Sequence, residues 1–367
     1  MTNRIKAMRT SIGKRMIRRP GRAGYHTVLA GKKSSAAPWL IIVCLLGIEF
    51  SFTSAARVDE SSPSAIKVMS YNIHRGGEML GQPLSQTVKA IESADADIVG
   101  IQETRSPKGD ALEDLAKLLG WNHDMGSSIL TRYEIIERLS GSKGRKYGQG
   151  YKGGVKVKLD SGRHAYFFNV HLPSHPYQPY QLLEIRPKWH KHTHDITFIK
   201  TEAEAIEWAK KARGADIAAL LEQINQLPDQ DAPVFVVGDF NEPSHLDWTE
   251  AAAKAGRHPI KVAYPTSTAM TKAGFSDSYR NIYPDEMENP GITWSPAYKP
   301  DEPTTHHDRI DFVYYKGEGL KVTEVKILGE NEENADLVVS PYPSDHRAVV
   351  ATFTLPDPER TTHEATE

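Results

Sequence analysis

The sequence places polar residues where several predicted strands end. Segments 66–72, 97–102, 164–170 and 233–238 are apolar and rich in β-branched residues, as buried strands are. An amide, carboxylate or imidazole stands at or just beyond the end of each: Asn72, Glu103, His171, Asp239 and Asn241. Burying such groups is costly unless they meet one another or a metal ion. We therefore expect these strand ends to converge in one polar pocket at the mouth of a sheet.

Strand and helix patterns alternate along the rest of the chain. Further strands are predicted near 153–159, 309–316, 321–328 and 347–354. Helices are predicted near 84–93, 110–119, 201–226 and 245–255. Gly214 is a candidate break between two helices in the third of these, and residues 172–200 have the composition of a loop. Short apolar strands mixed with helices indicate a layered α/β protein.

The first 56 residues have the composition of an export signal. A long basic region precedes the apolar run PWLIIVCLLGIEF at 38–50, and Ser54 and Ala56 form a small-x-small pattern after it. This order is typical of a secretory signal peptide, so we expect a periplasmic or extracellular protein. The alternative is that residues 37–56 stay uncleaved and tether the protein to a membrane. Residues 57–64 are then a linker, 65–355 the folded domain and 356–367 a polar, disordered tail.

Charge is distributed unevenly along the chain. Ten basic residues and one acid give residues 1–56 a net charge of +9, which leaves −11 of the chain's total of −2 for residues 57–367. The folded part therefore lacks the strongly basic surface that grips long nucleic acids. A bound metal ion can supply positive charge locally instead. Cys44 is the single cysteine, which excludes disulfides and thiolate metal sites from the rest of the chain.

Three later segments complete a set of polar motifs. GFSDSYR contains Asp277, HHDRIDFVYY contains Asp308 and Asp311, and PSDHRAVV contains Asp345 and His346. Together with MSYNIHRG, VGIQE, FNVHLPS and VVGDFNEPS, they resemble the endonuclease/exonuclease/phosphatase superfamily in the same order. GDFN followed about a hundred residues later by SDHR is the most specific part of this resemblance, which covers roughly 66–355. It implies a four-layer α/β sandwich in which two packed, mostly antiparallel mixed sheets are flanked by helices.

The resemblance also implies a role for each motif residue. Glu103 and Asp345 match the family's metal ligands, with Asn72 nearby as a neutral oxygen donor, and such hard oxygen ligands suit Mg²⁺, with Mn²⁺ as a substitute. Asp239, fixed by the turn to Asn241, matches the residue that orients or deprotonates the attacking water.

Two histidines complete the implied machinery. His346 matches the histidine that faces the scissile phosphate, and Asp311 is its expected carboxylate partner. His171 matches a second histidine of the deoxyribonuclease-like branch, which stabilises phosphoryl oxygens or protonates the leaving group.

Several assignments stay open at this point. Asp308 competes with Asp311 as the partner of His346, and His74 stands where apurinic endonucleases carry an acid, which puts a second metal position in doubt. Asp277 has the context of a structural turn residue. His190, His192 and His194 form either a metal or polyanion site or a solvated loop. Tyr177, Tyr180 and Trp189 are either stacking groups for a substrate or loop-packing residues.

The sequence therefore predicts a Mg²⁺-dependent phosphoesterase. A nuclease-like phosphodiesterase is favoured because of His171, so the expected partner is a phosphate-ester substrate, either nucleic acid or a small phosphodiester. The close alternative is a lipid or sugar phosphodiesterase or phosphatase. A non-catalytic exported binding module is the remaining hypothesis, although such proteins lose residues like Asp239, and this chain keeps them.

Overall fold

The computed structural model describes residues 65–141, 149–187, 196–299 and 302–355, all within the compact unit Asp59–Glu367. The predicted signal or anchor (1–56), the linker (57–64), the C-terminal tail (356–367) and the histidines at 190, 192 and 194 lie outside these residues. Within the described ranges, every helix is too short or too polar to cross a lipid bilayer.

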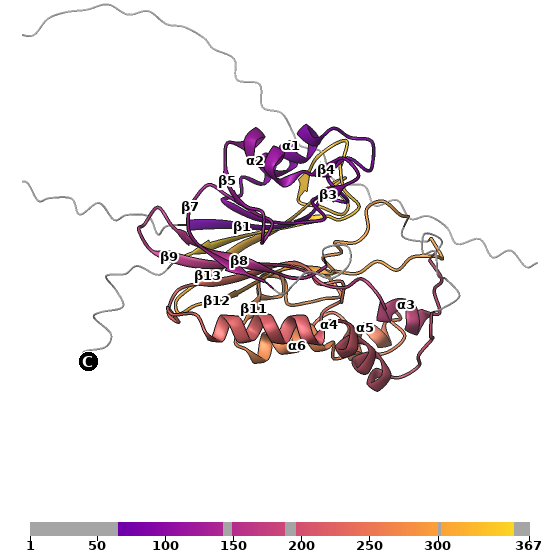
Figure 1. The fold of residues 1–367 in the computed structure, drawn as a ribbon. Helices are drawn as coiled ribbons and strands as arrows, with labels where there is room; N and C mark the ends of the chain where they lie inside the picture. Colours follow the sequence, from indigo (N-terminus) through magenta and orange to yellow (C-terminus); the bar gives the residue numbers. More distant parts are fainter. Residues whose placement is uncertain (1–64, 142–148, 188–195, 300–301, 356–367) are drawn as a thin grey trace, which may run out of the picture. The chain divides into compact units, whose positions relative to one another are not determined.

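Two mixed sheets form the centre of the domain (Figure 1). The strands of the first are, in spatial order, β14 (Leu337–Val338), β13 (Lys321–Gly329), β15 (Ala348–Thr354), β1 (Ala65–Asn72), β2 (Ile98–Gln102), β6 (Ile129–Thr131) and β5 (Asn122–Asp124). Those of the second are β11 (Ser276–Asp277), β12 (Asp311–Lys316), β10 (Val234–Asp239), β9 (His164–His171), β8 (Gly150–Lys158) and β7 (Glu134–Ser140). Strands β1 and β2, β9 and β10, and β13 and β14 pair in parallel, and the other neighbours are antiparallel. A small hairpin, β3 (Arg105–Ser106) and β4 (Gly109–Asp110), stands apart.

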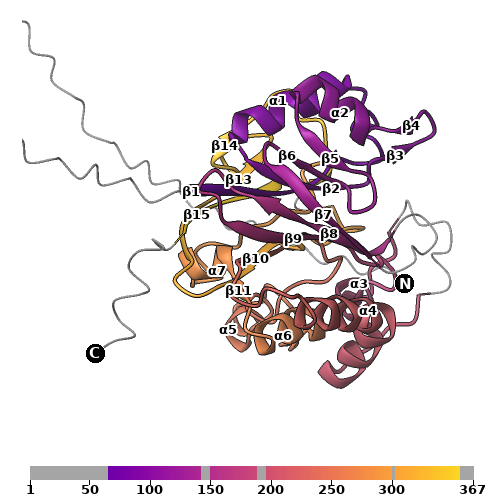
Figure 2. The same cartoon turned by 60° about the vertical axis from the view of Figure 1, so that its left-hand side comes forward.

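Helices cover the outer face of each sheet, as Figures 1 and 2 show. Apolar residues of α1 (Leu84–Ala94) and α2 (Leu112–Leu119) share a core with β1 and β2. Those of α4 (Glu202–Asn225) and α6 (Pro265–Lys272) share another with β9, β10 and β12. The remaining helices are α3 (Gln178–Leu183), α5 (Glu250–Lys254) and α7 (Ser278–Ile282). The predicted four-layer sandwich of two mostly antiparallel mixed sheets flanked by helices is confirmed.

The central core lies between the two sheets. Phe235 of β10 stacks on Phe167 of β9 and meets Phe353 of β15 edge-on, with ring centroids 5.0 Å apart in both pairs. At Gly100 in β2 the sheets approach so closely that a Cβ atom would lie 2.3 Å from a methyl carbon of Val237. A side chain at this position would push the sheets apart, so glycine is required by space rather than by backbone conformation.

Three helical regions differ from the sequence-based expectation. Helix α4 runs unbroken through Gly214, because a capping box between Thr201 and Glu204 starts it and the residues flanking the glycine favour helix. The helix expected over 245–255 is confined to α5, since Thr249 caps it and the preceding residues form a turn. The region expected to be a loop over 172–200 contains α3.

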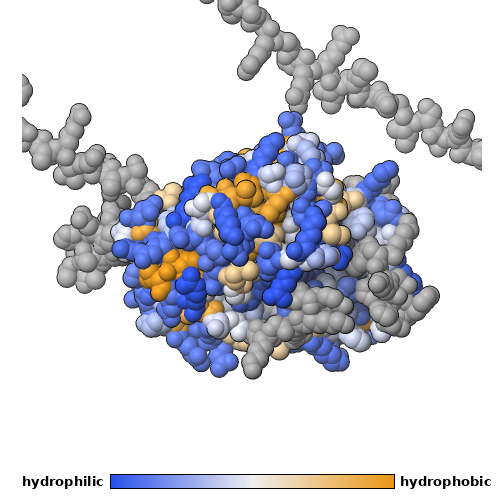
Figure 3. Space-filling model, turned by 45° about the horizontal axis from the view of Figure 1, so that its top comes forward, coloured by the Kyte–Doolittle hydropathy of each residue, from blue (hydrophilic) through white to orange (hydrophobic). Residues whose placement is uncertain are grey.

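The face of the domain in Figure 3 is mostly hydrophilic, with apolar residues gathered in a few separate areas. Large apolar side chains that are exposed come from several distant parts of the sequence: Met79, Leu80, Leu118, Met125, Ile136 and Val338. Exposed apolar residues that are scattered in this way are ordinary on a protein surface.

Candidate active site

The polar strand ends of both sheets meet at one edge of the sandwich. In the second sheet, His171, Asp239 and Asp311 occupy the same register position across β9, β10 and β12, so their side chains are neighbours. In the first sheet, Asn72 ends β1 and Glu103 directly follows β2. His346 precedes β15, which runs antiparallel to β1 and therefore begins at the same edge. Each sheet thus supplies part of the cluster.

Asp239 is at the centre of this cluster and is only 1% exposed. Its Oδ1 accepts a hydrogen bond from the backbone N–H of Asn241 (2.8 Å). Its Oδ2 accepts from the side-chain amides of Asn72 (3.0 Å) and Asn241 (3.1 Å). Burial, together with the charge of Asp311, raises the pKa of Asp239 to about 7 against the opposing effect of His346. The carboxylate is fixed in orientation and is tuned to exchange a proton near neutral pH.

The turn after β10 places Asn241 in direct contact with Asp239. Asn241 has φ of 49°, in the left-handed region, which asparagine tolerates better than most residues. Its side-chain amide also donates to the carbonyl oxygen of Leu172 (3.0 Å), one residue beyond His171. Asn241 therefore ties the ends of β9 and β10 together.

His346 is held between two aspartates. Its Nδ1 lies 2.9 Å from Oδ2 of Asp311, and its Nε2 lies 3.8 Å from Oδ2 of Asp239. Burial alone would lower the pKa of His346, but the charges of Asp311 and Asp239 outweigh it and raise that pKa to about 10. The imidazole is therefore cationic at neutral pH. The structure gives this partnership to Asp311 and directs the carboxylate of Asp308 elsewhere.

His171 faces the same carboxylates but has the opposite electrostatic character. Its Nε2 lies 3.6 Å from Oδ2 of Asp239 and 3.8 Å from Oε1 of Glu103. Burial, with the nearby positive charges of Lys152 and His346, holds the pKa of His171 well below its usual range. One imidazole of the site is thus charged and the other neutral at neutral pH.

Glu103 lies at the more open side of the cluster, with 28% of its side chain exposed. It has φ of 59°, and its Oε2 accepts a hydrogen bond from the backbone N–H of Arg75 (3.0 Å). Its backbone carbonyl accepts from the N–H of Gly76 (2.7 Å). The residues after β1 therefore hold Glu103 in an unfavourable backbone conformation that directs its carboxylate into the site.

Asn72 and Asp345 are connected through His74. The side-chain oxygen of Asn72 accepts from the backbone N–H of His74 (3.0 Å), and its amide nitrogen faces Asp239 and Glu103. Nδ1 of His74 pairs with Oδ1 of Asp345 (2.6 Å). This geometry makes the side-chain amide of Asn72 a donor that orients carboxylates, and its role as an oxygen ligand stays a prediction. His74, where the sequence departs from the family pattern, therefore has a direct contact with one of the site's acids.

A divalent cation fits the donor set of this cluster. The carboxylates of Glu103, Asp239 and Asp311 converge here through shared contacts with Asn72 and His346, and Asp345 directly precedes His346 in the chain. Ligand atoms of Asp239, Asp311 and His346 lie within 4.8 Å of one another, and Oδ1 of Asp311 is buried with no hydrogen-bond partner among the described residues. Carboxylate oxygens are the ligands that Mg²⁺ prefers. Glu103 and Asp345 are the more exposed of these acids, with 28% and 15% of their side chains accessible.

Three supporting residues lie outside the set that the sequence motifs identified. The hydroxyl of Ser344 donates to the backbone oxygen of Asn72 (2.6 Å) and accepts from the N–H of His346 (3.1 Å), which joins the two motifs. Below the site, Asn169 of β9 accepts from the amide of Gln102 in β2 (2.8 Å) and so bridges the sheets. Asn169 is two residues before His171 in the same strand, so the period-two rule could have indicated it.

Trp294 is a further neighbour that carried no sequence signal. It pairs through its backbone with both Asp308 and His346, and its ring centroid lies 6.5 Å from the imidazole of His346. Because it is only half-buried, this indole can contact a substrate held at His346.

The structure also places the residues whose roles were open. Asp277 caps α7, accepting from the N–H groups of Tyr279 and Arg280, and pairs with buried Arg309 (2.8 Å). This is the structural position expected for it. Tyr177 and Tyr180 are buried, with ring centroids 5.0 Å apart, so they pack the loop rather than offer a stacking surface.

Comparison with known proteins assigns the chain to a family. The sequence model of the Endonuclease/Exonuclease/phosphatase family matches residues 69–346, and the chain belongs to this family. Its members are hydrolases that act on phosphoester bonds.

One relative and two solved structures illustrate the relationship. An uncharacterized protein of Caenorhabditis elegans, F14F9.5, is 28% identical over 339 residues, covering 86% of this chain and 100% of the relative. A 3'-5' exonuclease from Neisseria meningitidis shares the fold at 15% identity with a TM-score of 0.50, covering 79% of this chain and 100% of that one. An AP endonuclease from Archaeoglobus fulgidus is 14% identical with a TM-score of 0.49, at 79% and 100% coverage.

Proposed function

We propose that this protein is a Mg²⁺-dependent phosphodiesterase that hydrolyses its substrate by attack of water at phosphorus. The observation that carries the proposal is the hydrogen-bonded cluster in which Asp239 lies 3.8 Å from a histidine paired with Asp311. A buried carboxylate beside a charged imidazole provides a proton acceptor and a stabiliser of negative charge within one site. Family membership limits the chemistry to phosphoester bonds.

Each residue contributes to the reaction through its position. Asp239 orients the attacking water and accepts its proton, because amide donors fix both carboxylate oxygens. His346 contacts the phosphoryl oxygens, where its positive charge stabilises the charge that develops there, and Asp311 keeps it protonated. His171 is neutral and can therefore donate a hydrogen bond to the same group without adding charge to the ground state.

The metal ion is best accommodated by Glu103 and Asp345. A Mg²⁺ ion held there would supply Lewis-acid polarisation of the phosphoryl group and would offset the excess of carboxylate charge. Asn72 holds Glu103 and Asp239 at a fixed separation by donating to both, at 3.4 and 3.0 Å.

For the substrate we propose a phosphodiester of the nucleic-acid type. The Neisseria structure that shares this fold is described as a 3'-5' exonuclease, and the sequence around His171 resembles that of the deoxyribonuclease-like branch. The half-buried ring of Trp294 beside His346 is positioned to contact a nucleobase or sugar.

A substrate panel tests the proposal. The full-length protein would be assayed with Mg²⁺ on bis-p-nitrophenyl phosphate, plasmid DNA, single-stranded DNA, RNA and sphingomyelin, with EDTA and Asp239→Asn as negative controls. We expect turnover of the simple diester and of a nucleic acid, and loss of both in the controls. Release of a lipid headgroup with all nucleic acids intact would reject the nucleic-acid substrate. Inactivity on every diester would reject the enzyme itself.

We also propose that residues 1–56 direct export. Their basic region, apolar run and small-residue pattern support this, with an uncleaved tether through 37–56 as the alternative form. N-terminal sequencing of protein recovered from outside the cytoplasm would show a start near residue 57 after cleavage. Full-length protein in the membrane fraction would indicate the tether, and full-length protein in the cytosol would reject export.

A further inference from the structure

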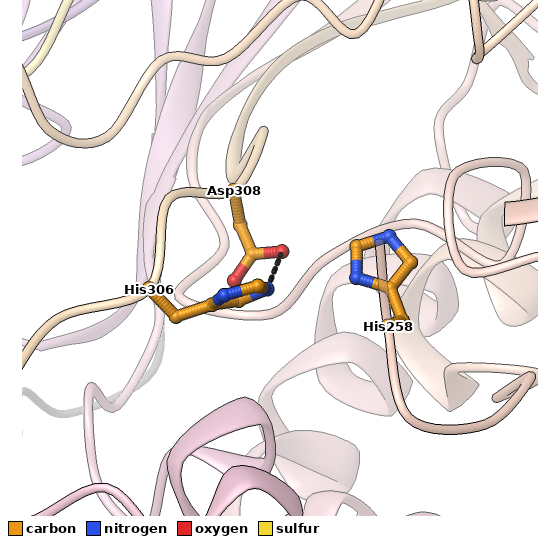
Figure 4. A group of neighbouring side chains, drawn as sticks. All are labelled: His258, His306 and Asp308. Carbon is orange, nitrogen blue, oxygen red and sulfur yellow. Dashed lines mark ion pairs between the residues drawn. The ribbon is translucent and has the colours of Figure 1, made fainter. Parts of the chain in front are cut away.

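A second group of metal-ligand side chains lies away from the site described above. His258, between α5 and α6, faces His306 and Asp308, which precede β12 (Figure 4). One ligand atom from each of the three residues lies within 4.8 Å of the other two. None of these residues belongs to the predicted catalytic or magnesium-binding set.

Two imidazole nitrogens in this group are buried without hydrogen bonds. Nδ1 of His258 and Nε2 of His306 are excluded from solvent and have no hydrogen-bond partner among the described residues. Nε2 of His306 lies 3.6 Å from Oδ1 of Asp308, which is too long for a hydrogen bond. Leaving a buried polar atom unsatisfied costs free energy. A ligand that accepts both lone pairs would remove this cost.

Asp308 has the surroundings of a metal-binding carboxylate. It is 2% exposed, and its Oδ1 accepts from Nε1 of Trp248 (3.0 Å) while its Oδ2 accepts from the hydroxyl of Tyr177 (2.6 Å). Both donors are neutral, so they orient the carboxylate without cancelling its charge. Hydrogen bonds of this kind commonly fix the ligands of a metal ion from behind.

Aromatic packing fixes the two histidines. The indole of Trp248 is fully buried and stacks on His258 with ring centroids 4.0 Å apart and an interplanar angle of 11°. It also meets His306 edge-on at 5.9 Å. The three ligand groups are therefore held in place before any ion binds, which reduces the entropy lost on binding.

We propose that His258, His306 and Asp308 form a second metal site that binds a divalent transition metal, with Zn²⁺ as the best match. Two imidazoles and one carboxylate are a common zinc ligand set, and imidazole favours zinc over Mg²⁺. Ligands of a tetrahedral zinc ion are about 3.3 Å apart, since each lies about 2.0–2.1 Å from the metal. The 3.6 Å between His306 and Asp308 is already close to this spacing.

The site would position the catalytic segment. Asp308 lies three residues before Asp311, and Trp294 pairs through its backbone with both Asp308 and His346. An ion held here would join the loop carrying His258 to the segment that leads into β12. The inference does not depend on the proposed phosphodiesterase activity, because zinc binding is measured without a substrate.

Metal titration of the full-length protein tests the proposal. In a Glu103→Gln/Asp345→Asn background, which removes the proposed magnesium ligands, the chelator-treated protein is expected to bind one equivalent of Zn²⁺ and to show a tetrahedral Co²⁺ absorption band. His258→Gln and His306→Gln should each weaken Zn²⁺ binding at least tenfold and abolish that band. His164→Gln, at the opposite end of β9 from His171, is the matched control and should change neither.

The histidines at 190, 192 and 194, outside the described residues, are the alternative zinc ligands in the sequence. A triple Gln variant of His190, His192 and His194 should retain the zinc equivalent and the Co²⁺ band. If the triple variant loses both while His258→Gln keeps them, the proposed site is rejected. Absence of stoichiometric Zn²⁺ in a protein whose circular dichroism is unchanged would reject it as well.

Discussion

At the scale of single residues, Asp239 has the most constrained environment in the active site. Three N–H donors fix its two oxygens, and burial keeps its pKa near 7. An ordinary aspartate is fully ionised at that pH and is a weak base. The surroundings of Asp239 therefore make it a stronger base than its residue type alone provides.

We expect Asp239→Asn to lower kcat by about 10²–10⁴-fold, because an amide of the same shape cannot accept the proton from water. Steady-state assays on a simple diester would measure this. Asp231→Asn, an exposed residue shortly before β10, is the matched control and should keep full activity. Comparable kcat values for Asp239→Asn and the parent protein would show that another group is the base.

Arg347, next to His346, is held by a bidentate contact with Glu330 at 2.8 and 2.5 Å. It also donates to the backbone oxygen of Ile292 (2.8 Å), two residues before Trp294. Burial would raise the pKa of Glu330, but the hydrogen bonds from Arg347 outweigh it and lower that pKa below its usual range.

The lowered pKa of Glu330 predicts that the stability of the protein depends on pH. Because the folded pKa of Glu330 is below the unfolded value of about 4.3, its stabilising contribution is complete above that pH and is lost as the pH falls through the folded pKa. Glu330→Gln should therefore lower the free energy of unfolding near neutral pH, and this difference should shrink in acid. Urea unfolding at several pH values measures it, with exposed Glu333→Gln as the control. A difference that is constant with pH would contradict the prediction.

At the scale of elements, the sequence predicted the strands that carry the site better than the helices around it. Strands β1, β2 and β10 are short apolar runs that end in a polar residue, and this pattern gives both their type and their end. Gly214 suggested a helix break that is absent, because a glycine in a helix costs only about 1 kcal/mol. The long flanking helical segments of α4 and their burial against the second sheet outweigh it.

The helical conformation of Gly214 makes it a site for stabilisation. A Cβ atom there would lie 3.8 Å from the nearest atom, on Lys210, so alanine fits without repacking. We expect Gly214→Ala to raise the free energy of unfolding by about 0.5–1 kcal/mol. The urea midpoint would measure the gain.

Gly120 is the matched control for this substitution. It also has free space around it, but its φ is +70° at the end of α2. Alanine there should lower the free energy of unfolding by about 1 kcal/mol. Equal effects of the two alanines would show that backbone conformation is not the cause.

At the scale of the whole molecule, the proposed metal site connects activity with stability. An ion that binds the folded chain alone stabilises it by about 2.7 kcal/mol at a concentration of 100 Kd. Mg²⁺ should therefore raise Tm, and EDTA should reverse the rise. Glu103→Gln and Asp345→Asn should each reduce this shift in differential scanning fluorimetry, whereas exposed Glu113→Gln on α2 should keep it. An undiminished shift in both site variants would place the ion elsewhere.

The sequence could indicate which residues belong to the site but not every contact between them. The resemblance to the family, carried by the order of motifs, placed Asp239, His346 and Glu103 in one site. The choice of Asp311 over Asp308 depends on strand register, because only the former faces Asp239 across the β10–β12 pair. Trp294 acts through backbone pairing and Ser344 through a hydroxyl that contacts a distant backbone, and no residue pattern predicts either contact.

The hydrogen bond from Gln102 to Asn169 joins the two sheets, and this has a consequence for how the protein loses activity. Because one sheet brings Glu103 and His346 and the other brings Asp239 and Asp311, neither half retains a partial catalyst once the two separate. A fragment that keeps only one sheet would be inactive. A change in core packing that moves the sheets apart by a fraction of an ångström would lower turnover before either sheet unfolds. Inactivation under denaturant or hydrostatic pressure should therefore precede, or coincide with, the loss of β-structure, and never follow it.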